Sequence, residues 1–292
     1  MLIAHFSDIH LLTLRGVHPF HFLGKRATGG VNLLLNRGGE FPVAVVRALV
    51  QDLNEQAPEQ VLVSGDLTNL AFPGEFELAR GILTELKLPA SDITIVPGNH
   101  DYYTRQSFRA DHFGRIMRSF LQGDIQPGPD DFPFLRLRGD LAIVALRTAR
   151  PSAPLLAVGS LGDRQIEQAE HLLSSAECQK RFRLVVLHHA PCPSHVKWHN
   201  RLTDANAFLA MLRRVGAELV VHGHLHRALQ QSVPGPEGQG PIPVIGVGSG
   251  TWLSPRDAGR RAQYNLYEIE GRRLIQVKTR KYELLGKTFV PC

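Results

Sequence analysis

Apolar residues along the chain follow two alternating patterns. Short runs of aliphatic and β-branched residues predict buried strands, and between them lie longer segments whose apolar residues recur every three or four positions, as in amphipathic helices. Strands, some with the loop that follows, are expected at 2–7, 60–66, 92–101, 181–191, 217–227, 228–233, 242–247, 263–269 and 274–280, and a hairpin over 132–147 turns at Gly139-Asp140. Helices are expected at 41–56, 73–88, 105–121, 162–176 and 204–216. This alternation predicts an α/β fold with ligands bound beyond the carboxyl ends of its strands.

Composition narrows the class of protein. No repeat or low-complexity linker divides the 292 residues, so we expect one domain over 1–292 with a β-rich carboxyl-terminal part at 228–280. The formal net charge of +6 predicts an anionic partner: a phosphate ester, a nucleic acid or an acidic lipid headgroup. Three scattered cysteines argue against a disulfide framework, and we find neither a secretory signal nor an apolar run of about 18 residues. A cytoplasmic protein is therefore expected.

Side chains that can bind metal ions follow five of the predicted strands. They are Asp8 and His10, Asp66, Asn99 with His100 and Asp101, His188 with His189, and His224 with His226. Within the pairs Asp8–His10 and His224–His226 the spacing is two residues, which places both side chains on one face of an extended segment. Each short motif alone is a weak signal, because a turn or a buried core histidine explains it equally well. Their joint occurrence at strand ends predicts one common site.

The residue types indicate which ions this site binds. Mixed histidine, aspartate and asparagine ligands suit Mn, Fe, Zn, Ni or Co better than Mg or Ca, which prefer shells of oxygen alone. Asp66 has two oxygens that can bridge two cations, and Asn99 adds a neutral oxygen donor. Two ions ~3.5–4 Å apart clamp a phosphate and generate hydroxide at neutral pH. The sequence therefore predicts a metal-dependent phosphoesterase.

Five motifs, in this order, resemble those of the calcineurin-like metallophosphoesterase superfamily. They are DIH (8–10), GD (65–66), GNHD (98–101), HH (188–189) and GHLH (223–226), and the resemblance covers about three quarters of the chain. It implies a two-sheet α/β sandwich flanked by helices, with the active site at the carboxyl ends of strands. It also implies hydrolysis of a phosphodiester or pyrophosphate bond by a metal-bound hydroxide.

The resemblance further implies a role for each motif residue. Asp8, His10 and His226 would hold one ion, Asn99, His188 and His224 would hold the second, and Asp66 would bridge both. The imidazole of His100 would protonate the leaving oxygen or stabilise charge on the phosphoryl group, and Asp101 would orient that imidazole. Because the two histidines of HHAP align with the family in either register, His189 stays an alternative ligand; we favour His188, which makes His189 a neighbour of the ligands or a substrate-binding group.

Two further segments are candidates for substrate or membrane contact. His195 and His199 lie in the loop after 181–191, where with Trp198 and Arg201 they could line a substrate pocket or simply stand exposed. Segment 11–40 is long for a connection and interleaves basic with bulky apolar residues, with no acid before Glu40. We expect it to form a peripheral contact with an anionic membrane, a lid over the site or a dimer contact.

Several functions compete within these limits. A cyclic-nucleotide phosphodiesterase and a lipid-linked UDP-sugar pyrophosphatase both belong to the implied class. His100 counts against the lipid enzyme, whose best-known members carry arginine there, whereas segment 11–40 counts in its favour. A nuclease is less expected because no basic and aromatic platform for nucleic acid occurs. A noncatalytic scaffold is disfavoured because every ligand motif is complete.

Overall fold

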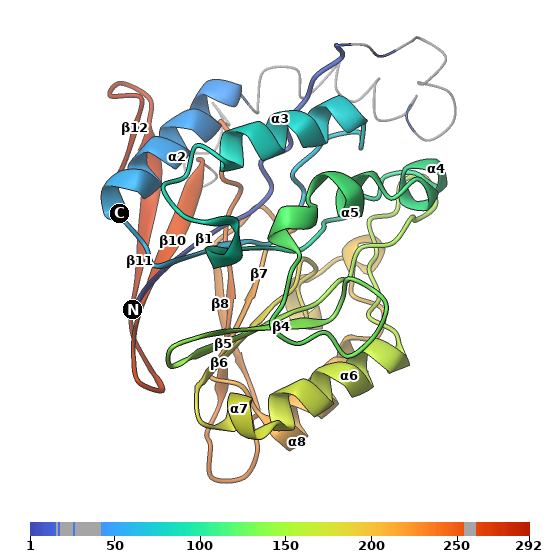
Figure 1. The fold of residues 1–292 in the computed structure, drawn as a ribbon, viewed down its shortest axis with the longest axis vertical. Helices are drawn as coiled ribbons and strands as arrows, with labels where there is room; N and C mark the ends of the chain where they lie inside the picture. The colour runs from blue at the N-terminus through green and yellow to red at the C-terminus, as the bar shows by residue number, and fades with distance from the viewer. Residues whose placement is uncertain (16, 18–25, 27–41, 254–260) are drawn as a thin grey trace.

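The computed structural model describes residues 1–15, 17, 26, 42–253 and 261–292, and Figure 1 gives their arrangement. Most of segment 11–40 therefore lies outside the described residues. Among the described helices, none is long and apolar enough to cross a membrane.

Two six-stranded sheets form the centre of the protein. The first has the order β12-β11-β10-β1-β2-β3. It comprises β1 (Leu2–Phe6), β2 (Gln60–Val63), β3 (Ile93–Ile95), β10 (Gln263–Glu270), β11 (Arg273–Glu283) and β12 (Thr288–Pro291). Strands β1, β2 and β3 are parallel, with Ala4 opposite Val61, and β10 to β12 extend the sheet antiparallel. The carboxyl ends of β1, β2 and β3 therefore lie at one edge.

The second sheet has the order β4-β5-β6-β7-β9-β8. It comprises β4 (Phe134–Arg138), β5 (Leu141–Ala145), β6 (Phe182–Val186), β7 (Leu219–His222), β8 (Leu229–Val233) and β9 (Ile242–Gly246). Strands β5, β6, β7 and β9 are parallel, and β4 and β5 form the predicted hairpin. Along β5, Ile143 packs into the core between the sheets while Val144 packs against the outer helices, so both faces are buried.

Helices cover the outer faces of both sheets, as Figure 1 shows. The longer ones are α2 (Val43–Gln56), α3 (Pro73–Leu83), α6 (Asp163–Ser174) and α8 (Ala205–Val215), and α7 (Ala176–Gln179) is one short turn. Residues of α2 and α3 share a core with β1 and β2, whereas α6 and α8 pack on the second sheet. The predicted two-sheet α/β sandwich flanked by helices is confirmed.

One local prediction was wrong, and one short strand was missed. The single helix expected at 105–121 is three pieces, α4 (Arg105–Arg109), α5 (His112–Ile116) and η4 (Arg118–Phe120). The break falls at Asp111, whose left-handed φ of 46° ends one helix while its side chain accepts a hydrogen bond from Gly114 N and caps the next. Strand β12 was not predicted, and its four residues are too few to give a recognisable pattern. Three further 3-10 turns are η3 (Ala90–Asp92), η5 (Pro193–His195) and η6 (Trp198–Asn200).

Candidate metal centre

The loops that follow β1, β2, β3, β6 and β7 bring the predicted ligands together. In the part of the chain that the structure describes, three groups of side chains have possible ligand atoms within 4.8 Å of one another: Asp8, His10 and His226; His10, Asp66 and His100; and Asp66, His188 and His224. Because His10 and Asp66 each belong to two of these groups, the three groups form one continuous cluster. All the predicted metal ligands except Asn99 are members, and Asn99 contacts the cluster through His188.

The backbone that carries these ligands is not extended, so the reason given for the two-residue spacing was wrong. Five ligand residues have left-handed φ values: Asp8 (56°), His10 (44°), Asp66 (54°), His224 (73°) and His226 (51°). Such a conformation costs on the order of 1–3 kcal/mol per residue and persists only where surrounding contacts impose it. Here the contacts include Asp8 N to Gly65 O at 2.9 Å and His10 N to Asp66 O at 3.0 Å. The loops are held in the shape that the cluster requires.

Two glycines let these loops approach each other closely. A Cβ on Gly98 would lie 2.1 Å from Asp66 Oδ1, and one on Gly223 would lie 1.9 Å from Ser7 Oγ. Any side chain at either position would therefore displace a loop that carries ligands.

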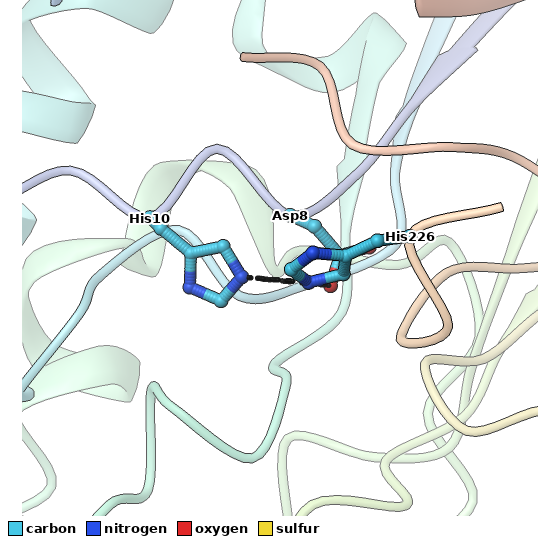
Figure 2. Close-up of side chains that lie close together, drawn as sticks. All are labelled: Asp8, His10 and His226. Carbon is cyan, nitrogen blue, oxygen red and sulfur yellow. Dashed lines mark hydrogen bonds and ion pairs between the residues drawn. The ribbon is translucent and has the colours of Figure 1, made fainter. Parts of the chain in front are cut away.

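The first group, Asp8, His10 and His226, is drawn in Figure 2. The Nε2 atoms of His10 and His226 are 3.0 Å apart, and Nε2 of His226 is 3.2 Å from Oδ1 of Asp8. This Oδ1 is buried and has no hydrogen bond from the described residues. Burial alone would raise the pKa of Asp8, but His226, His188 and His10 hold that pKa well below its usual range. A buried, ionised carboxylate beside two imidazoles fits a cation.

The second group contains His188, whose tautomer can be assigned from its partners. Its Nδ1 lies 2.7 Å from the carbonyl of Ser64, which can only accept, so Nδ1 carries the proton. The Nε2 lone pair then faces Asn99 Oδ1 at 3.1 Å and Asp66 Oδ2 at 3.5 Å. Burial lowers the pKa of His188, which disfavours a second proton there. The three acceptor atoms, Nε2 of His188, Oδ1 of Asn99 and Oδ2 of Asp66, converge in a buried site. Their lone pairs can lie this close together when a cation lies among them.

His224 joins this group through its other ring nitrogen. Its Nε2 donates to the carbonyl of Asn200 at 2.9 Å, which leaves Nδ1 as the acceptor atom. Burial and the neighbouring His188 hold the pKa of His224 well below its usual value, so the ring is neutral. A ligating histidine that donates its second N–H to a carbonyl is the usual arrangement at protein metal sites.

Asp66 connects the two groups through a single oxygen. Its Oδ2 lies 3.8 Å from His10 Nε2 and 3.5 Å from His188 Nε2. Its Oδ1 accepts a hydrogen bond from the backbone N of His100 at 2.7 Å, which fixes the carboxylate. Asp66 is thus placed where the predicted bridging ligand is needed, and the residues present fit two transition-metal ions.

His100 lies beside the cluster, with its ring edge-on to that of His10 at 4.7 Å between centroids and stacked on Tyr103 at 5.4 Å. Its Nδ1 donates to the backbone carbonyl of Asn69 at 2.7 Å. This contact could not be predicted from the sequence, because Asn69 accepts through its main-chain carbonyl. Asn69 thereby orients the imidazole, a role that we had predicted for Asp101.

The predicted contact between Asp101 and the imidazole of His100 was wrong. Among the described residues, the buried carboxylate of Asp101 accepts hydrogen bonds from Gly98 N, Leu67 N, Thr68 N and Thr68 Oγ1, at 2.9 to 3.3 Å. Burial raises the pKa of Asp101 to about 6 despite these bonds. Asp101 therefore ties the loop after β2 to the loop after β3, and each loop carries a ligand.

The remaining predicted residues lie around this cluster. His189 is fully buried, with Nδ1 2.7 Å from Thr148 Oγ1 and Nε2 3.2 Å from the carbonyl of Ala157, so neither ring nitrogen is directed at a substrate. The ring of His199 is half-buried against that of Trp198, and its substrate contact stays a prediction. The side chain of His195 lies outside the described residues. Trp252, not predicted, packs its ring edge-on to His226 at 5.2 Å.

Comparison with known proteins defines the class. Residues 1–228 match the family described as calcineurin-like phosphoesterase, and the chain belongs to this family. Its members depend on two metal ions, and family membership supports metal-dependent phosphoester hydrolysis as the class of reaction.

Individual proteins resemble the chain over only part of its length or at low sequence identity. Over 101 residues the chain is 32% identical to the glycerophosphodiester phosphodiesterase GpdQ of Enterobacter lignolyticus (strain SCF1), a match that spans 35% of this chain and 30% of that protein. A dimetal phosphatase from Danio rerio has a similar fold, with a TM-score of 0.64 at 13% identity over 96% of this chain and 95% of that one. A purple acid phosphatase from yellow lupin seeds (Lupinus luteus) gives 0.58 at 12% identity, over 100% of this chain and 52% of that one.

Proposed function

We propose that this chain is a dinuclear metal phosphodiesterase. The observation that carries the proposal is the position of Asp66, whose Oδ2 lies within 3.8 Å of a histidine from each of two ligand groups. A carboxylate oxygen shared between two histidine-containing groups suits a pair of ions.

Each ion would have its own ligands. Asp8, His10 and His226 would hold one, Asn99, His188 and His224 the other, and Asp66 both. When bound, the ions supply positive charge for the phosphoryl oxygens and lower the pKa of water. Manganese, iron, zinc, nickel and cobalt all accept this mixture of nitrogen and oxygen ligands.

His100 would act on the leaving group. The hydrogen bond from Nδ1 to Asn69 O at 2.7 Å fixes the plane of the ring beside His10 and Asp66. In that position a protonated Nε2 can donate to the oxygen that leaves phosphorus, and such proton transfer contributes roughly 10²–10⁴-fold to rate. An ester that leaves as an alkoxide needs this proton most.

Phosphodiesters are favoured over other esters for two reasons. Protonation by His100 suits a poor leaving group, and the partial match to a glycerophosphodiester phosphodiesterase agrees with diester substrates. Pyrophosphate cleavage is the alternative. A cyclic nucleotide and a lipid-linked UDP-sugar remain the candidate substrates. A cytoplasmic location and contact with anionic membranes through 11–40 remain proposals as well. Co-sedimentation with phosphatidylglycerol vesicles would test the membrane contact.

The test compares esters and variants. Protein loaded with Mn²⁺ is assayed with bis(p-nitrophenyl) phosphate, p-nitrophenyl phosphate and a nucleoside diphosphate sugar, before and after chelation. We expect the diester to be cleaved fastest. We expect His100→Ala to retain its metal and to lower kcat, more for diphenyl phosphate, whose leaving group is basic, than for bis(p-nitrophenyl) phosphate. The control is His171→Ala, because His171 is exposed on α6 away from the cluster. Absence of hydrolysis with every divalent metal would refute the proposal, and loss of metal in His100→Ala would refute the role of His100.

A further inference from the structure

The turn that follows Asn69 is strained and held from both sides. Asn69 supplies the carbonyl that accepts from His100, and the next residues, Leu70 to Phe72, lead into α3. Ala71 in this turn has a φ of 57°, a left-handed conformation without the glycine that would make it easy. Something must fix this turn, and two buried ionisable residues that the reaction does not use, Arg26 and Glu75, contact it directly.

Arg26 binds the carbonyl side of the turn. Its Nε donates to Leu70 O at 3.0 Å and its Nη2 to Ala71 O at 3.2 Å. The guanidinium lies 4.3 Å above the ring of Phe72, and the residue is 5% exposed. Only the planar fork of an arginine can make two such bonds and stack on a ring at once. Arg26 belongs to segment 11–40, and its side chain contacts the turn.

Glu75 binds the amide side of the same turn. Its Oε2 accepts from Leu70 N at 3.0 Å and from Phe72 N at 3.1 Å, and the side chain is fully buried at the third position of α3. Burial raises the pKa of Glu75 to about 8, while hydrogen bonds from Leu70 and Phe72 and the charge of Arg26 oppose the shift. With Arg26 on the carbonyls and Glu75 on the amides, the peptide units from Leu70 to Phe72 have little freedom to rotate.

We propose that Arg26 and Glu75 are positioning residues for His100, acting through the carbonyl of Asn69. This inference rests on the proposed function only in its kinetic consequence. The plane of the Asn69–Leu70 peptide is shared by the carbonyl that receives His100 Nδ1–H and the amide that Glu75 binds. Rotation of that peptide would turn the carbonyl away from His100 and release the ring.

The consequence is a change in sensitivity to the leaving group. Because His100 would protonate the leaving oxygen, a loosely held ring should slow esters of basic leaving groups more than esters of acidic ones. A general loss of folding or of metal would slow both equally. The ratio of the two rates therefore separates a positioning role from a merely structural one.

Kinetics of Arg26→Met provide one test. We expect kcat for diphenyl phosphate to fall about tenfold, and kcat for bis(p-nitrophenyl) phosphate to fall much less, with KM and metal content unchanged. Arg26→Lys should lose less than Arg26→Met. Glu75→Gln should keep most of the wild-type rate, because the glutamine oxygen still accepts both amides, whereas Glu75→Leu should repeat the selective loss on diphenyl phosphate. In a His100→Ala background, Arg26→Met should have no further effect. Equal loss on both esters, or an undiminished effect in that background, would overturn the proposal.

A second measurement does not depend on turnover. In protein labelled with ¹⁵N-histidine and loaded with Zn²⁺, the Nδ1–H signal of His100 is assigned by its absence from His100→Ala. We expect Arg26→Met to shift or broaden this signal, and Arg47→Met to leave it unchanged, since Arg47 is exposed on α2. An unchanged signal in Arg26→Met would overturn the positioning role, whereas an inactive wild type with the expected shift would overturn only the proposed function.

Discussion

Replacing Asp101 with asparagine should destabilise the protein, because four donors converge on this buried carboxylate. Its Oδ1 accepts from Thr68 N and Thr68 Oγ1, and its Oδ2 from Gly98 N and Leu67 N. An asparagine has one acceptor oxygen, so two donors would face an NH₂ group instead. Each buried donor without a partner costs about 1–3 kcal/mol, which gives a loss of about 2–6 kcal/mol.

Thermal unfolding followed by circular dichroism measures this loss. For a chain of this size we expect Tm to fall on the order of 10 °C. Asp130→Asn is the control, because Asp130 is exposed in the loop before β4. Metal affinity should weaken too, since Asp101 ties together the loops that carry Asp66 and Asn99. An Asp101→Asn variant that kept the wild-type Tm and lost only kcat would refute the role of Asp101 in tying the two loops together.

Two further predictions concern pH and metal removal. Because burial raises the pKa of Glu75 to about 8, above that of the unfolded carboxyl, its protonated form stabilises the fold at low pH and this stabilisation is lost as pH rises through 8. The unfolding free energy of the wild type, relative to Glu75→Gln, should therefore fall by up to about 4 kcal/mol between pH 5 and pH 9 in urea titrations; a constant difference would contradict it. Chelated protein should gain about 2.7 kcal/mol for each site that fills when Mn²⁺ is restored at 100 times its Kd, measured as a rise in Tm. An unchanged Tm would mean that the cluster does not bind the ion.

Most strands and helices could be predicted from the sequence because the patterns that define them are local. Runs such as those of β1 and β6 are short, apolar and followed by turns, so they are recognisable one at a time. The prediction of a single helix at 105–121 was wrong because Asp111 adopts a left-handed conformation, which the spacing of apolar residues does not reveal. The resemblance to the family then implied the two-sheet sandwich, which no local pattern contains, and the order of the strands came only from the structure.

The predicted metal ligands do lie together, but the two-residue spacing on an extended segment is not what brings them together. Motifs at strand ends identified Asp8, His10, His224 and His226, but an extended backbone does not bring them together. Left-handed turns and long-range hydrogen bonds do, and these depend on the assembled sheets. Contacts through main-chain atoms, such as the carbonyl of Asn69 with His100, are independent of side-chain identity and therefore left no trace in the sequence.

The proposed function requires that the cluster bind two metal ions. Elemental analysis of purified protein, dialysed against metal-free buffer after loading, measures this directly. We predict about two transition-metal ions per chain, about one in His188→Ala, and two in the control His171→Ala. A folded wild type that retains none, or a His188→Ala variant that retains both, would contradict it.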